Sequence, residues 1–193
     1  AAERLLSALL HDAGIVPLAV TGADPRIEGI SVDSRQAPTG TLFFALPGER
    51  TSGESFVPEA LARGAIAVLA PSPRPAGIGG EIAWVQVEAP RLAAGRLARE
   101  WHGRPDEALT LVGITGTNGK STVAAMVEAI ARAAGLRAGR IGTVGIAVNG
   151  AERPSARTTP ESVDLFAMLA EMRAAGVTLV AMEVSSHGLV LGR

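Results

Sequence analysis

Cysteine is absent from the sequence, which excludes disulfide bonds and cysteine-based metal sites. The sequence also shows no signal peptide and no apolar run of transmembrane length. No stretch is strongly basic and the formal net charge is −1, so non-specific binding to nucleic acid is not expected. Of the 193 residues, 47% are hydrophobic and 19% are charged, which predicts one or two globular domains. A cytoplasmic location is the default expectation.

Lysine is almost absent as well. Lys120 is the only lysine among 18 basic side chains, and every other basic position holds arginine. Lysine is a compact charge at the end of a slim stem, whereas the arginine head is a wide planar fork. The single lysine therefore marks a position where a narrow loop needs the slimmer cation.

Lys120 belongs to a glycine-rich stretch that follows an apolar strand pattern at 109–114. The glycines let the backbone point successive N–H groups at an anion, and a helix beginning near Lys120 adds its positive end. Lys120 would reach the terminal phosphates of a nucleotide, and the Ser121 hydroxyl would bind Mg²⁺. Ile114 departs from the general pattern, which has glycine there, and a plain turn between a core strand and a core helix is the alternative. The predicted phosphate-binding loop consists of Gly116, Thr117, Asn118, Gly119, Lys120, Ser121 and Thr122.

The second part of the chain alternates strand and helix patterns, which predicts a parallel sheet with helices on its faces. The predicted strands are 109–114, 141–148 and 177–184, and the predicted helices are 121–134 and 161–175.

The first part of the chain predicts a small α/β domain of its own. Its predicted strands are 27–32, 41–46, 65–70 and 82–87, and its predicted helices are 3–10, 56–63 and 91–102. In the last of these helices Leu92, Leu97 and Trp101 are expected to share one face. The polar segment 103–107 contains Pro105, and we place the domain boundary there, giving domains 1–107 and 108–193.

Glu183 closes a buried strand pattern and is expected at the carboxyl end of that strand, where sites of parallel sheets collect. A carboxylate there can hold Mg²⁺ beside bound phosphates, although capping of a turn is the alternative. His187 follows closely and could be a ligand or a base, but a lone histidine in a turn more often makes a local hydrogen bond.

Thr158, Thr159 and Pro160 precede the helix predicted at 161–175. Thr159 is expected as the N-cap and Pro160 at the first helical position, which explains both residues without a function. A helix N-terminus beside a phosphate loop also binds anionic groups, and Arg157 and Arg153 add positive charge there.

Taken together, three motifs in this order resemble the Mur ligase family: 116–122, Thr158-Thr159-Pro160 and 182–189. Asp33-Ser34-Arg35, followed by 40–46 and a glycine-bearing loop, resembles the branch of that family that acts on UDP-N-acetylmuramoyl-L-alanyl-D-glutamate. The resemblance covers nearly the whole chain.

The resemblance implies a ligase of peptidoglycan synthesis that uses ATP and Mg²⁺. ATP would phosphorylate the D-glutamate carboxylate, and the amine of meso-diaminopimelate or L-lysine would then attack the acyl phosphate. Lys120 and Glu183 are the implied catalytic residues, and Ser121 and Glu183 the implied metal ligands. Family analogy implies a monomer.

The resemblance also implies two groups of substrate contacts. Val32, Ser34, Glu49, Arg50 and Thr51 would hold the uracil and diphosphate end, whereas Arg157, Thr158, Thr159, Ser185 and Arg193 would meet the muramoyl-dipeptide end. Relatives often have asparagine in place of Arg157 and glutamine in place of Leu191, so this chain departs from the family there.

The family further uses a carbamylated lysine, and this chain has no lysine besides Lys120. We therefore expect a part of a longer ligase that binds the UDP substrate but does not complete ligation alone. Three alternatives stay open: a sibling ligase of the family, a P-loop kinase or regulatory NTPase, and a UDP-sugar-binding module without catalysis.

Overall fold

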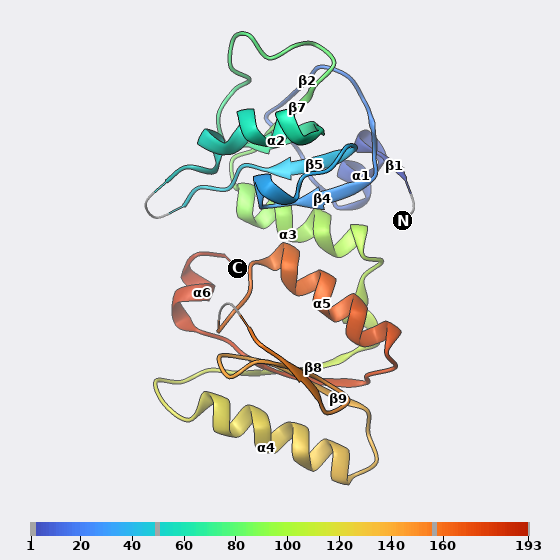
Figure 1. Ribbon diagram of the computed structural model, residues 1–193, viewed down its shortest axis with the longest axis vertical. Coiled ribbons are helices and arrows are strands. Elements are labelled where there is room, and N and C mark those ends of the chain that lie inside the picture. Colours follow the sequence, from blue (N-terminus) through green and yellow to red (C-terminus); the bar gives the residue numbers. More distant parts are fainter. Residues whose placement is uncertain (1–2, 49–50, 156–157, 193) are drawn as a thin grey trace. The chain divides into compact units, whose positions relative to one another are not determined.

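The computed structural model describes residues 3–48, 51–155 and 158–192, and it confirms an α/β fold class. The chain divides into two compact units, Ala1–Trp101 and His102–Arg193 (Figure 1). The domain boundary expected after Glu107 stays a prediction. Within the described part of the chain, no helix has both the length and the apolar character needed to cross a membrane.

The first unit is built on a five-stranded sheet in the order β2-β7-β6-β5-β4. Four strands run parallel, and β2 joins the edge antiparallel to β7. Two further strands form a small antiparallel ribbon. The sheet strands are β2 (Ala19–Thr21), β4 (Gly29–Ser31), β5 (Thr41–Phe44), β6 (Ala65–Ala70) and β7 (Ala83–Gln86), and the ribbon strands are β1 (Arg4–Leu5) and β3 (Arg26–Ile27).

Helices cover both faces of this sheet. Helix α2 lies on one face, and α3 lies on the other with α1 beside it (Figure 1). Helix α2 ends at Gly64, whose φ of 119° is a left-handed conformation that glycine adopts without strain. Phe43, Val68 and Trp84 are buried between α2 and the sheet. The helices are α1 (Leu6–Asp12), α2 (Val57–Arg63) and α3 (Pro90–Trp101), with short 3-10 turns η1 (Ser34–Gln36) and η2 (Gly53–Phe56).

The second unit has a sheet in the order β11-β10-β9-β12-β8. Strands β9, β12 and β8 are parallel. Strand β12 pairs with both of the others, so it lies between two strands that precede it in the chain. Strands β10 and β11 are antiparallel, which makes this sheet mixed and not wholly parallel as expected. The strands are β8 (Thr110–Ile114), β9 (Ala138–Ile141), β10 (Ile146–Val148), β11 (Ala151–Arg153) and β12 (Leu179–Glu183), preceded by the turn η3 (Pro105–Ala108).

Helix α4 (Lys120–Ala133) covers one face of this second sheet and α5 (Ser162–Ala174) covers the other (Figure 1). The apolar core on the α5 side contains Ile141, Leu169 and Met172, all at most 1% exposed. A short helix, α6 (Ser186–Val190), follows β12 where only a polar turn was expected.

Three sequence-based expectations about elements are wrong. The helix predicted at 3–10 begins only at Leu6, because Arg4–Leu5 pair with β3 as strand β1. The stretch 141–148 is not one strand, because residues 142–145 form a turn between β9 and β10, closed by hydrogen bonds between Gly142 and Gly145. Leu92 is 54% exposed and does not share the buried face of α3, which consists mostly of alanine around Leu97. Small side chains allow α3 to approach the sheet closely, so a search for large apolar residues misplaces its inner face.

Candidate functional site

The glycine-rich loop connects the end of β8 to the start of α4, as expected. Gly116 and Gly119 have φ values of 146° and 80°, which side chains other than glycine rarely adopt. These two conformations turn the backbone out of the strand and into the helix within residues 115–119. The amides at the start of α4 therefore face the mouth of the loop, in the arrangement that binds phosphate.

Lys120 is the first residue of α4 and folds back over the loop. Its Nζ donates to the carbonyl of Gly116 at 2.8 Å and to that of Thr117 at 3.5 Å. The ammonium is thus held beside the loop amides by backbone contacts alone. Carbonyl oxygens are weak partners for a cation compared with phosphate oxygens, so an anion on the loop would compete favourably for Nζ.

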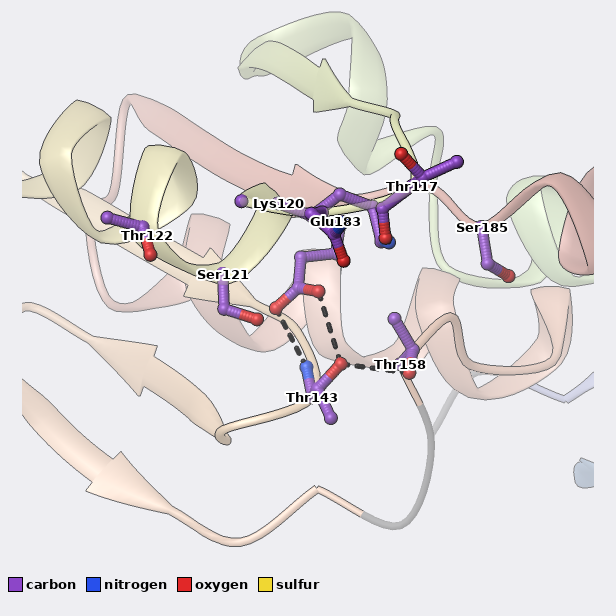
Figure 2. Close-up of a pocket in the computed structure, with 10 residues that line it drawn as sticks. Thr117, Lys120, Ser121, Thr122, Thr143, Thr158, Glu183 and Ser185 are labelled. Atoms are coloured by element: carbon purple, nitrogen blue, oxygen red, sulfur yellow. Dashed lines mark hydrogen bonds between the residues drawn. The ribbon is translucent and has the colours of Figure 1, made fainter.

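Glu183 is the last residue of β12, and it lies beside Ile114 at the end of β8. Its side chain is 1% exposed, and Thr143 holds both carboxylate oxygens. The Thr143 backbone N–H donates to Oε1 at 2.9 Å and the Thr143 hydroxyl donates to Oε2 at 3.1 Å (Figure 2). A Cβ atom at Gly142 would lie 2.1 Å from Oε1, so the carboxylate needs glycine at that position.

The Thr143 hydroxyl also contacts Thr158, with 2.9 Å between the two Oγ1 atoms (Figure 2). A hydroxyl carries a single proton, and an ionised carboxylate can only accept. Thr143 therefore donates to Glu183 and accepts from Thr158. These two hydrogen bonds connect the end of β12, the turn 142–145 and the segment that precedes α5.

Thr159 is buried and does not cap α5, contrary to expectation. The N-cap of α5 is Glu161, and Pro160 lies before it and not at the first helical position. The Thr159 hydroxyl instead accepts from the Ser185 backbone N–H at 3.0 Å and lies 3.2 Å from the Glu183 carbonyl. Thr159 thus ties its segment to the end of β12, a long-range contact that a local capping rule does not anticipate.

Ser185 is the N-cap of α6, and its Oγ accepts from the Gly188 backbone N–H at 3.0 Å. His187 lies in the same short helix and is exposed. His187 does not line the pocket that the phosphate loop forms with Glu183.

These segments enclose a polar pocket of about 320 Å³, which brings together the predicted loop and Glu183 (Figure 2). Its charged members are one cation, Lys120, and one anion, Glu183, and the rest are hydroxyl, amide or glycine residues. Thr143 was not predicted from the sequence, because it lies within a stretch interpreted as a strand. The two glycines that flank Thr143 and Val144 were the available signal for a turn. The pocket is lined by Thr117, Asn118, Gly119, Lys120, Ser121, Thr122, Thr143, Thr158, Glu183 and Ser185.

The pocket offers a hydroxyl and a carboxylate to a metal ion, from Ser121 and Glu183. Oxygen ligands of this kind suit Mg²⁺, which retains several waters and binds through one or two protein groups plus phosphate oxygens. Across the described ranges, His, Cys, Asp and Glu side chains do not gather in groups of three that could hold a metal by themselves. The residues present therefore fit a metal that arrives together with phosphates, and they do not form a metal site on their own.

The first unit holds the other predicted contacts. Strands β4 and β5 are parallel neighbours, so the segments that follow them, with Val32 and Ser34 after β4, lie at one edge of the sheet. Ser34 is buried and its Oγ donates to Glu59 Oε2 of α2 at 2.7 Å. Thr51 is exposed in the loop after β5. Predicted contacts Glu49, Arg50, Arg157 and Arg193 lie outside the described residues.

Asp33 and Arg35 form a bidentate pair around Ser34. Arg35 Nε donates to Asp33 Oδ1 at 2.9 Å, and an Nη donates to Oδ2 at 2.8 Å. Asp33 Oδ1 also accepts from the Arg35 backbone N–H and so caps η1. These bonds, the side-chain bond first, hold the pKa of Asp33 below its ordinary value of 3.8. Asp33 and Arg35 thus set the backbone turn that presents Ser34.

Comparison with known proteins bears on both units. Residues 26–102 match the Mur ligase family, catalytic domain, and residues 114–193 match the Mur ligase middle domain. The chain is 46% identical over 177 residues to the UDP-N-acetylmuramoyl-L-alanyl-D-glutamate--2,6-diaminopimelate ligase of Solibacter usitatus, covering 92% of this chain and 35% of that protein. The protein of the same name from Geobacillus kaustophilus is 44% identical, with coverage of 89% and 34%. The chain therefore spans about a third of the length of these relatives.

Two solved ligase structures superpose on this chain. A structure of a UDP-N-acetylmuramoyl-L-alanyl-D-glutamate--2,6-diaminopimelate ligase superposes with a TM-score of 0.77 at 25% identity, covering 99% of this chain and 38% of that one. MurF from Acinetobacter baumannii superposes with a TM-score of 0.60 at 23% identity, covering 96% and 36%. The second likeness shows the fold alone.

Thr143→Val is predicted to lower the free energy of unfolding by about 1–3 kcal/mol, because a buried carboxylate loses one of its donors. Thr143→Ser keeps the hydroxyl and should cost less than about 1 kcal/mol. Chemical denaturation at pH 7 measures both variants. Equal losses for valine and serine would contradict the assigned hydrogen bond.

Asp33→Asn is predicted to remove a contribution to stability that depends on pH. The pKa of Asp33 is lowered in the folded state, so its contribution is present at neutral pH and is lost as the pH falls through the folded pKa. Asparagine can still accept the backbone bond of the cap, but it loses the charge and one of the two oxygens that accept from Arg35. The difference in melting temperature between parent and variant should be present at pH 7 and should shrink below pH 3.8. A difference that grows on acidification would contradict this account.

Proposed function

The chain belongs to the Mur ligase family, and from this membership we propose that it serves ATP-dependent amide-bond formation in peptidoglycan synthesis. The proposed reaction joins 2,6-diaminopimelate to UDP-N-acetylmuramoyl-L-alanyl-D-glutamate, in the cytoplasm. The single observation that carries the proposal is the pocket in which Lys120 and the phosphate loop face the buried Glu183 carboxylate. We further propose a monomer, by analogy with the family.

In the proposed first step, a carboxylate oxygen of the D-glutamate side chain attacks the γ-phosphorus of ATP, and ADP leaves. The loop amides and Lys120 spread the negative charge that moves onto the β–γ bridging oxygen. Ser121 and Glu183 are the proposed ligands of Mg²⁺, which neutralises further charge on the phosphates when bound. Thr143 keeps the Glu183 carboxylate oriented toward the loop for this purpose.

In the proposed second step, the amine of the incoming amino acid attacks the acyl carbon, and inorganic phosphate leaves with the bonding pair. The amine loses a proton as the amide forms. Little covalent chemistry is asked of the protein, so positioning and electrostatic stabilisation supply the rate. This agrees with a pocket that is rich in hydroxyl groups.

The muramoyl-dipeptide end of the substrate is proposed to meet Thr158, Thr159 and Ser185, and Arg157 and Arg193 are kept as proposed contacts. The Thr159 hydroxyl is already engaged by β12 and α6, so we expect Thr159 to shape this subsite more than to bind within it. The uracil and diphosphate end is proposed to lie on the first unit. Its proposed contacts are Val32, Ser34, Glu49, Arg50 and Thr51.

The choice of amino acid rests on the relatives. Diaminopimelate is named in the relatives that are 46% and 44% identical, so we favour it over L-lysine. The solved structure of MurF, the sibling ligase, superposes with a TM-score of 0.60, against 0.77 for the solved ligase named for 2,6-diaminopimelate. A P-loop kinase leaves the first unit, which matches the Mur ligase family at 26–102, without an explanation.

Lys120→Ala is predicted to weaken binding of a fluorescent ATP analogue by more than about tenfold, because a charge-assisted contact to phosphate contributes about 1.5–3 kcal/mol. Lys120→Arg should restore little of the affinity for the ATP analogue, since the planar guanidinium does not fit the narrow loop. Arg132→Ala removes an exposed cation from the last turn of the same helix and serves as the control. Parental affinity in Lys120→Ala would overturn the nucleotide assignment.

Calorimetric titration with UDP-N-acetylmuramoyl-L-Ala-D-Glu tests the substrate assignment. We expect saturable binding that free UDP partly reproduces and that Ser34→Ala weakens, because that variant removes the hydroxyl that Glu59 orients at the edge of the first sheet. Thr39→Ala, at an exposed threonine of the same unit, is the control for the loss of a surface hydroxyl. Absence of binding by a folded chain, or binding insensitive to Ser34→Ala, would count against this placement.

A further inference from the structure

Helix α4 presents an unusual face to its sheet. Its buried residues are Ala124, Glu128 and Ala131, which share one side of the helix at a spacing of four and three residues. The large apolar side chains lie elsewhere: Met126 is 57% exposed and Ile130 is 69% exposed. Two methyl groups, one carboxylate and the half-buried Val127 therefore make up this side of the helix, and no large apolar side chain among the described residues of α4 is fully buried there.

The directional contact on this face is a buried ion pair between Glu128 of α4 and Arg140 of β9. Arg140 Nε donates to Glu128 Oε2 at 2.9 Å, and the two side chains are 7% and 9% exposed. Ala147 and Ala181 lie directly beside Arg140 on the neighbouring strands, which leaves room for the long side chain. Arg140 also reaches Glu152 of β11 at 2.5 Å, where the carboxylate is 63% exposed.

A buried ion pair of this kind is a poor source of stability. Desolvation of both charges offsets most of their attraction, and apolar replacements of similar volume are often neutral or stabilising. The pair is geometrically specific, because the Arg140 guanidinium reaches the Glu128 carboxylate at only one position of α4 along β9. The pair fits a role in fixing position better than a role in holding the unit together.

The position of α4 along β9 matters because each residue of the ion pair belongs to an element that borders the pocket. Glu128 is in the helix that begins at Lys120, and Arg140 is in the strand that precedes Thr143. Glu128 is eight residues after Lys120, which is about 12 Å along the helix. Arg140 lies one residue before the end of β9, and the turn that follows begins at Gly142, where an added Cβ would clash with the Glu183 carboxylate. A shift of α4 along β9 would move Lys120 and Ser121, at the start of the helix, relative to that carboxylate.

We propose that Glu128 and Arg140 are positioning residues for the phosphate loop. Their ion pair sets the register of α4 on β9 and thereby the separation of Lys120 and Ser121 from Glu183. The inference rests on the proposed nucleotide binding for its consequence, although the register itself can be measured without a ligand.

The test replaces the pair by apolar side chains of similar size, Glu128→Leu together with Arg140→Met. The melting temperature is expected to equal or exceed that of the parent. Hydrogen exchange of the α4 amides at 123–128 is nevertheless expected to rise, and affinity for a fluorescent ATP analogue with Mg²⁺ to fall by about tenfold or more. Glu152→Gln is the matched control, because it removes the charge of the exposed partner of Arg140 without touching α4. It should leave all three quantities at parental values.

A stable double variant with parental exchange at 123–128 and parental affinity would overturn the inference, since a merely structural pair predicts that outcome. If the double variant does not fold, Glu128→Gln takes its place. Its melting temperature is expected to fall, because Arg140 loses a buried counter-charge, and the criteria for exchange and affinity stay the same. A parent chain that binds no nucleotide would contradict the proposed function instead. The exchange measurement still decides the register in that case, because it needs no ligand.

Discussion

The arrangement of the pocket in the second unit depends on the hydrogen bonds that hold one buried carboxylate. Glu183 ends β12, the strand between β9 and β8, and Thr143 satisfies both of its oxygens from the turn between β9 and β10. Burying a carboxylate is costly unless it is hydrogen-bonded, so the turn, the glycine at 142 and the hydroxyl of Thr158 form a connected set. A change in any member alters the position or the solvation of the charge. The carboxylate is thus fixed in place before any ligand arrives.

The order of strands brings the phosphate loop to that carboxylate. Strand β12 lies between β8 and β9, so the segments that follow all three strands emerge at one edge of the sheet. Residues from sequence positions near 117, 143 and 183 therefore line one pocket. The helix that starts at the loop turns two alanines, the half-buried Val127 and the ion-paired Glu128 toward the sheet, so we propose that a directional polar contact sets its position.

Sequence patterns predicted the parts of this site that follow from local rules. A strand, a glycine-rich turn and a helix start define the loop, and an acid that ends an apolar run defines Glu183. Thr143 was missed because apolar residues on both sides of it made 141–148 look continuous, and the pairing of β9 with β10 is a tertiary property. Thr159 was misassigned as a cap because its real partners lie 24 and 26 residues away. Leu92 was placed inside because alanine carries little signal of burial.

The most direct measurement is a crystal structure of the chain with ADP and Mn²⁺, with data collected at the manganese absorption edge. The account predicts the diphosphate on the amides of residues 116–122 and an anomalous peak at about 2.0–2.2 Å from the Ser121 hydroxyl, on the side that faces Glu183. The Glu183 carboxylate should keep its bonds to Thr143 or turn one oxygen to the metal. A diphosphate bound away from the loop, or manganese bound without contact to Ser121 or Glu183, would contradict the account.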